Sequence, residues 1–164
     1  MKTLLLLLPL IFAFSCQKQA NTSVGINSAT PLVEQETTPV KEIDVKLTFD
    51  IEGKETRKPK IAGITNLPEQ TKLLITVKGK NIKYTGQEET SVYKGRFESS
   101  EFSLENKELP LGEYTVDVVM PLSHTQTEGV QQIIGKNGEN LKGALVVKGS
   151  LGIVVKVVQH FQLK

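Results

Sequence analysis

Residues 109–120, with the sequence LPLGEYTVDVVM, carry the clearest secondary-structure signal in this chain of 164 residues. Tyr114, Val116, Val118 and Met120 recur at every second position, and the residues between them are mostly polar. Such alternation is typical of a β-strand that buries one face and exposes the other. We therefore predict a half-buried strand in the second part of this segment.

The same period of two recurs on both sides of this strand. It predicts further strands at residues 43–51, 61–65, 73–77, 82–85, 90–93, 97–104 and 151–163. No segment has a convincing helical stripe, and residues 129–134 are expected to form one turn at most. Residues 134–138 favour a hairpin, because their Asn-Gly pair tolerates the positive φ angles of tight β-turns. Residues 85–90 are interpreted as a loop. Residues 42–164 are thus predicted to be all-β, an antiparallel sandwich of about seven to nine strands.

A resemblance to a known class of module refines this prediction. Residues 109–118 resemble the L-P-x-G-x-Y-x-V-x-V segment of immunoglobulin-like and transthyretin-like modules of bacterial envelope proteins. The resemblance implies that Pro110 and Gly112 form a corner, and that the Tyr114 hydroxyl bonds back across it as a tyrosine corner. Residues 66–73 similarly resemble the strand-turn-strand found early in such modules. The implied fold is a single antiparallel immunoglobulin-like β-sandwich, and it implies no activity, because sandwiches host many unrelated functions.

The N-terminus carries a short targeting signal that leads to the only cysteine of the chain, Cys16. Lys2 precedes an apolar run at residues 4–14, which has the length of a signal-peptide core and is too short for a membrane-spanning helix. Residues 13–16, Ala-Phe-Ser-Cys, resemble the lipobox of bacterial lipoproteins. The resemblance implies that the signal is cut before Cys16 and that its thiol receives a diacylglycerol.

The lipobox resemblance also implies a location. Two or three acyl chains hold a protein firmly in a membrane. Because Gln17 and not an aspartate follows the cysteine, resemblance to Gram-negative sorting signals implies, for such a host, the outer membrane, on its periplasmic or surface face. In a host with a single membrane the same signal implies the cell surface. The alternative is an ordinary secretory signal cut near Ser15 or Ala20, with Cys16 incidental.

The segment that follows Cys16 differs in composition from the rest of the chain. Residues 17–41 are rich in Ser, Thr, Asn, Gln and Pro and contain no aromatic residue. Such a composition does not bury enough apolar surface to offset the entropy of ordering, so we expect a flexible linker. The expected organisation is a signal peptide at 1–15, the lipidated cysteine and linker at 16–41, and the β-sandwich domain at 42–164.

Charge and cysteine content narrow the classes of function. The chain has 20 basic and 18 acidic residues, and removal of residues 1–15 takes away one basic residue, Lys2. A balance so close to neutral argues against a nucleic-acid partner, which needs a concentrated basic surface. Because Cys16 is the only cysteine, the mature domain is expected to have no disulfide, thiolate metal site or cysteine nucleophile.

Few residues are available for catalysis or metal binding. The two histidines, His124 and His160, lie in a polar loop and on the polar side of the last strand, and no nucleophile motif accompanies them. The acidic pair Glu88 and Glu89 lacks the regular spacing of calcium ligands. We therefore expect no catalytic residue, no metal and no cofactor.

The long polar, glycine-containing region at residues 121–149 is the candidate binding surface. Loops at one end of a sandwich commonly carry binding residues, and long connections tend to be functional or disordered. Tyr84 and Tyr93 lie in strand-like segments and are interpreted as packing residues. The candidate contact residues of the loop are Lys136, Asn137, Glu139, Asn140 and Lys142. The alternative is a decorated hairpin without a ligand.

Together these observations favour a lipid-anchored bacterial envelope protein with a non-catalytic domain for binding or scaffolding. Its expected partners are the membrane, through Cys16, and an envelope protein of unknown identity. An alternative is an inhibitor or exclusion-type lipoprotein that blocks an enzyme or receptor through residues 121–149. A hydrolase ranks third.

Overall fold

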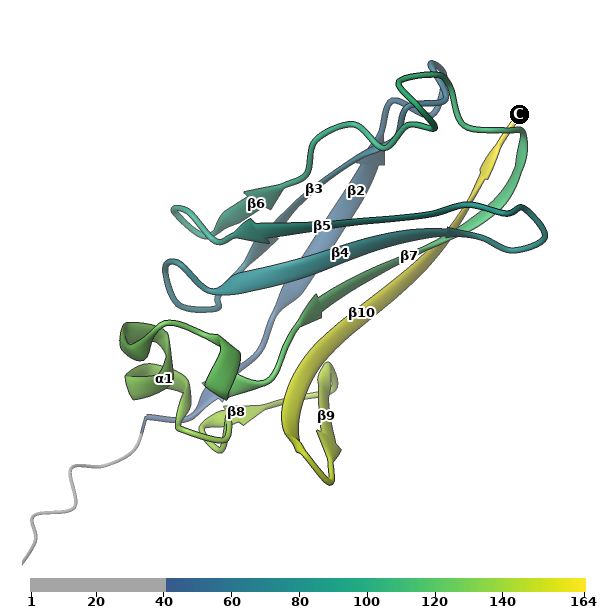
Figure 1. The fold of residues 1–164 in the computed structure, drawn as a ribbon. Helices are drawn as coiled ribbons and strands as arrows, with labels where there is room; N and C mark the ends of the chain where they lie inside the picture. The colour runs from purple at the N-terminus through teal and green to yellow at the C-terminus, as the bar shows by residue number, and fades with distance from the viewer. Residues whose placement is uncertain (1–40) are drawn as a thin grey trace, which may run out of the picture. The chain divides into compact units, whose positions relative to one another are not determined.

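A computed structural model describes residues 41–164 of the protein (Figure 1). The expected signal peptide, Cys16 and the linker up to residue 40 lie outside the described residues. Within the described range the elements are β1 (Ile43–Asp44), β2 (Leu47–Glu52), β3 (Lys60–Thr65), β4 (Lys72–Gly79), β5 (Thr85–Ser91), β6 (Arg96–Glu98), β7 (Gly112–Met120), the 3₁₀-helix η1 (Ser123–Thr125), α1 (Glu128–Ile134), β8 (Leu141–Lys142), β9 (Val146–Gly149) and β10 (Gly152–Leu163).

Eight of these strands form two antiparallel sheets, which confirms the prediction of an all-β sandwich. One sheet has five strands in the order β5-β4-β7-β10-β9, and the other has three in the order β2-β3-β6 (Figure 1). The remaining pair, β1 and β8, is parallel and only two residues long. That pair joins the start of the described chain to the region between α1 and β9.

The inward faces of the two sheets share one hydrophobic core. On the central strands β4 and β7 every second side chain is buried, and the residues between them point outward. The five-stranded sheet contributes chiefly Leu73, Ile75, Val77, Tyr114, Val116, Val118 and Val155, and the three-stranded sheet contributes Leu47, Phe49, Ile61 and Phe97. Because strand side chains alternate between faces, each sheet also has an outward face.

Tyr114 anchors the corner that precedes β7. Its hydroxyl donates a hydrogen bond of 2.7 Å to the Pro110 carbonyl, the kind of contact that the resemblance implies. The ring stacks on Phe161 at a centroid distance of 5.4 Å and meets the edge of Tyr84 at 6.2 Å. Burial raises the pKa of the Tyr114 hydroxyl, so the group stays a neutral donor. Three aromatic rings thus close the core at the end where β7 begins.

Residues 85–90 are a strand, and their interpretation as a loop is wrong. They form most of β5, which pairs with β4 at the edge of the five-stranded sheet. Its side chains are all polar or small, so no apolar alternation reveals it. On its inward side the Glu88 carboxylate accepts hydrogen bonds from the Ser100 backbone N–H and hydroxyl, at 3.0 and 3.1 Å. The strand expected at 82–85 is likewise wrong, because only Thr85 of that segment lies in a strand.

Residues 128–134 form a helix, so the expectation of at most one turn there is wrong. Thr127 caps α1 with its side chain, and Val130 and Ile134, one turn apart, bury their side chains in the core. Residues 134–138 end the helix and turn, and they do not form the expected hairpin. Gly135 and Gly138 take positive φ angles of 90° and 81° there. No helix in the described part has the length and apolar character needed to cross a membrane.

The strand expected at 97–104 is much shorter than predicted. Only residues 96–98 pair with β3, and they form β6. Beyond them Phe102 turns into the core, and Leu104 makes a single bridge to Lys107. The regular ladder ends at Ser99, where the side-chain hydroxyl and not the backbone carbonyl accepts the Ile61 N–H, while the Ser99 N–H still donates to the Ile61 carbonyl at 2.8 Å.

Candidate functional site

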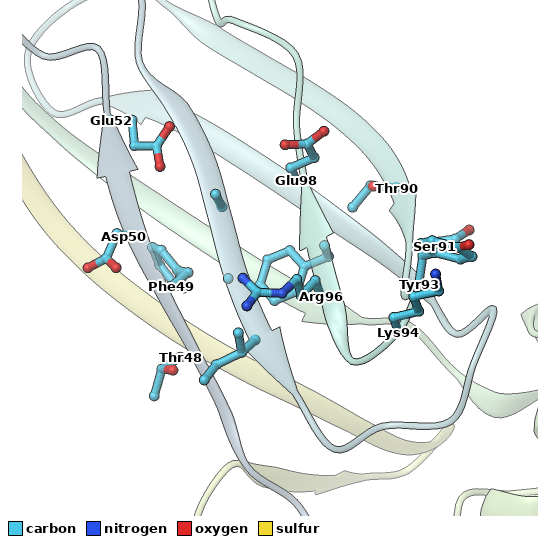
Figure 2. A pocket seen from close by; sticks show the side chains of 14 residues that line it. Thr48, Phe49, Asp50, Glu52, Thr90, Ser91, Tyr93, Lys94, Arg96 and Glu98 are labelled. Carbon is cyan, nitrogen blue, oxygen red and sulfur yellow. The ribbon is translucent and has the colours of Figure 1, made fainter.

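The outward face of the three-stranded sheet is hollowed into a cavity of about 710 Å³, here called the outer groove (Figure 2). Its lining includes residues from β2, β3, β6 and the turn that links β5 to β6. The residues that bear on its chemistry are Asp50, Glu52, Ile64, Tyr93, Lys94 and Arg96.

Strand register forms the floor of the outer groove. Ile64 on β3 pairs with Thr48 on β2 and with Arg96 on β6, so the three outward side chains form one row. In the next row Ala62 lies between larger residues and leaves the hollow. Ile64 is 55% exposed although it sits on the middle strand of the sheet.

A tight turn forms the rim on one side. Tyr93 and Arg96 pair across it, and both residues between them, Lys94 and Gly95, have positive φ angles of 51° and 71°. The Glu69 carboxylate accepts the Lys94 backbone N–H at 2.9 Å and holds the turn. Tyr93 is 65% exposed, with the Lys94 ammonium 5.0 Å from its ring centroid. Its interpretation as a packing residue is therefore wrong.

The charges of the outer groove are separated across its width. Figure 2 shows the Arg96 side chain extending from β6 over the neighbouring β3. Of the acidic residues, Glu98 is paired with Lys60 at 2.7 Å, and this contact raises the pKa of Lys60. None of the six ion pairs found in residues 41–164 involves Arg96, Asp50 or Glu52. The groove thus offers a cation toward β6 and carboxylates toward β2.

The predicted contact residues of the 121–149 region lie close together, but most of them hold the fold. The Glu139 carboxylate accepts the Asn137 backbone N–H at 2.7 Å, and the Asn140 amide donates to the Ile133 carbonyl at 2.9 Å. Lys142 pairs with Glu42 of the segment before β1 at 2.5 Å. The contact with Glu42 raises the pKa of Lys142.

Lys136 and Asn137 differ from these three residues. Both lie in the turn after α1, and Asn137 contributes its backbone N–H to the Glu139 carboxylate. Lys136 is exposed, and so is Asn137. The region as a whole is compact, because Val130, Ile134 and Leu141 belong to the core.

The histidines lie in separate places. On the outward face of the five-stranded sheet, His160 Nδ1 is 3.1 Å from the Thr115 hydroxyl. His124 lies in η1, where the neighbouring Ser123 hydroxyl bonds to the Gly135 carbonyl at 2.5 Å. Within residues 41–164 no group of three or more His, Cys, Asp or Glu residues is arranged to hold a metal ion.

The outer groove is not apparent from the sequence. Ile64 lies three positions after the buried Ile61, so its side chain points to the opposite face of the strand. This spacing indicates an outward apolar residue within the strand. The residues 93–96, Tyr-Lys-Gly-Arg, carry a turn signal with an aromatic and two basic residues. Neither signal shows that β2, β3 and β6 bring these residues to one face.

Comparisons with known proteins give no further guide to the site. A scan against protein-family models finds no match, and neither a search of curated proteins nor a search of solved structures finds one.

Proposed function

We propose that this protein is a lipid-anchored bacterial envelope protein whose β-sandwich binds another envelope protein through the outer groove, without catalysing a reaction. The observation that carries the proposal is the gathering of exposed Tyr93, exposed Ile64 and Arg96 in one concave patch. Tyrosine and arginine, with tryptophan, are enriched among the residues that dominate the binding energy of protein interfaces.

The charge pattern of the groove supports a protein partner of defined polarity. Arg96 and Lys94 lie on the side of β6, whereas Asp50 and Glu52 lie on β2. A partner segment that places a carboxylate over Arg96, an apolar side chain over Ile64 and a basic group near Asp50 would match all three features. Complementary charges of this kind fix orientation and speed association.

The groove is tested by photo-crosslinking in the native envelope. A photoreactive residue at position 64 is expected to capture one partner, because that position lies on the groove floor. The matched control is position 78, where exposed Lys78 occupies the outward face of the other sheet on β4. The captured band should weaken at least about tenfold when Arg96→Glu is added, since the substitution reverses the charge beside the floor.

The same experiment separates the outer groove from the 121–149 region. A photoreactive residue at position 136 reports on the loop that the inhibitor hypothesis uses. A band at position 136 without one at position 64 would support that alternative and contradict the outer groove. Equal bands at positions 64 and 78 would also contradict it.

The anchor is tested separately. The proposal expects labelling of the full chain by radioactive palmitate and its release from membranes on Cys16→Ala, because that change removes the acylated thiol. Cys16→Ala that leaves both labelling and membrane association intact would refute the anchor and leave the groove to be judged by its own experiment.

A further inference from the structure

The last strand has a free edge over more than half its length. On one side β7 pairs with β10 from residue 155 to residue 163. On the other side β9 pairs only with residues 152–155, and one further bond joins the Lys156 N–H to the Leu145 carbonyl. Residues 157–163 therefore have no strand partner on that side in the described part of the chain.

The direction of the backbone groups at this edge follows from that bond. The Lys156 N–H points toward β9 and donates a hydrogen bond of 2.9 Å to the Leu145 carbonyl. Because the direction alternates along a strand, the N–H and C=O groups of Val158, His160 and Gln162 point the same way. Three donors and three acceptors thus form a row ready for another strand, and such groups normally find partners.

This edge lacks the features that keep the other strand edges from pairing with a further strand. Residues 157–163 read VVQHFQL, with no Lys, Arg, Asp, Glu, Pro or Gly. By contrast, β5 carries the inward Glu88, and β6 and β9 have only three and four residues. At the edge of β2 the Gln159 amide occupies the Phe49 carbonyl at 3.0 Å. A long, uncharged edge with high β-propensity is a site of strand addition.

The free stretch is complementary to itself. Its midpoint is His160, so antiparallel pairing of two copies over the full stretch places His160 opposite the partner's His160. Val158 then faces the partner's Gln162, and Val157 faces the partner's Leu163. No like charges meet within the stretch, and Lys156 meets the partner's Lys164 only at its two exposed ends. A two-fold axis at His160 closes the assembly at two copies.

We propose that the free edge of β10 joins two copies of this protein into a dimer with one continuous sheet across the interface. The proposal is independent of the outer groove, which lies on the outward face of the other sheet. The proposed interface consists mainly of backbone hydrogen bonds. We therefore expect a reversible dimer, whose fraction rises with protein concentration.

Cysteine pairs test the register. In the full chain in its membrane, oxidation of His160→Cys is expected to give a disulfide-linked dimer, because directly opposed residues lie about 5.5 Å apart between Cα atoms. Val158→Cys alone should give none, because its copies are offset by four residues, roughly 13 Å. Chains with Val158→Cys mixed with chains carrying Gln162→Cys should link. Equal dimer from His160→Cys and Val158→Cys, or none from either, would overturn the proposal.

Two lysine variants test the affinity. His160→Lys places two like charges opposite each other at the proposed axis, whereas Thr115→Lys puts the same charge one strand away. Both remove the contact between Thr115 and His160. Sedimentation of the purified full chain in detergent should show a concentration-dependent dimer for the parent and Thr115→Lys. The His160→Lys dimer should be roughly tenfold weaker. A parent that stays monomeric at all concentrations contradicts the proposal.

Discussion

At the scale of the residue, Tyr114 combines two contributions to stability. Its side chain is only 1% exposed, and its ring packs between Phe161 and Tyr84. Its hydroxyl donates a hydrogen bond to the Pro110 carbonyl. The ring contacts and the hydrogen bond are separable, because phenylalanine retains the ring and loses only the donor. The Pro110 carbonyl would then lose that partner in the variant.

Tyr114→Phe is predicted to lower the free energy of unfolding by about 1 kcal/mol, the usual net effect of one hydrogen bond. Denaturation in urea measures it. The matched control is Tyr84→Phe, because Tyr84 is half-buried and its hydroxyl makes only a long contact of 3.4 Å to the Ser103 carbonyl. The control should lose less than half as much. Equal losses of unfolding free energy in the two variants would mean that the hydrogen bond to Pro110 stabilises the fold no more than the long Tyr84 contact does.

Glu139 gives a prediction about pH. The backbone N–H groups of Glu139 itself and of Asn137 hold the pKa of its carboxyl below the usual range. A carboxyl with a lowered folded-state pKa stabilises the fold above its unfolded pKa of about 4.3, and the stabilisation is lost as the pH falls through the folded-state value.

Glu139→Gln is therefore predicted to be less stable than the parent near pH 7. The difference should shrink as the pH falls below the unfolded pKa of about 4.3, because the stabilisation by the carboxylate is then progressively lost. Urea denaturation at pH 7 and across the acidic range measures the difference. A difference that does not change with pH would show that the amide loses packing and not charge.

At the scale of the element, β3 depends on a residue without a side chain. Gly63 lies between Phe49 on β2 and Phe97 on β6. A Cβ atom there would lie 2.4 Å from Phe97 Cζ and 2.4 Å from the Thr48 carbonyl oxygen. The missing side chain lets the Phe97 ring lie against the strand, so glycine is a packing requirement of the three-stranded sheet.

Gly63→Ala is predicted to cost about 1–3 kcal/mol, because the core must shift to admit one methyl group. Gly129→Ala is the matched control in α1, where an added Cβ meets nothing within 4 Å. That variant should gain about 0.5–1 kcal/mol from helix propensity. Thermal unfolding of both variants measures the contrast, and a loss at Gly129 like that at Gly63 would refute the steric explanation.

The same scale shows which elements the sequence reveals. Strands β2, β4, β7 and β10 bury one face of apolar residues, so their period of two is visible. The polar strand β5 is held by its pairing with β4, which local sequence does not display. The helix α1 has only seven residues, and Thr127 followed by Val130 and Ile134 is a short signal within a glycine-containing region.

At the scale of the whole molecule, the sandwich could be predicted and the outer groove could not. Enough alternating segments within about 120 residues indicate two packed sheets. The groove requires the register that sets Ile64 beside Arg96, and register depends on pairing between distant strands. The compactness of residues 121–149 could not be predicted either. The apolar residues of this region are few and widely spaced in the sequence, and each packs separately against the core.

The short parallel pair between β1 and β8 has a mechanical consequence. Tension applied to the N-terminal side of Ile43 would fall first on its bond to the Asn140 carbonyl, 2.8 Å, and on the Val45 bond to Lys142, 2.9 Å. Asn66 holds the same stretch, because its amide donates to the Asp44 carbonyl and accepts the Lys46 N–H. Rupture of these contacts would release residues 43–46, roughly 13 Å of extended chain, and leave both sheets intact. For a domain held by its N-terminus, this strand would detach and draw Val45 out of the core before either sheet loses a strand.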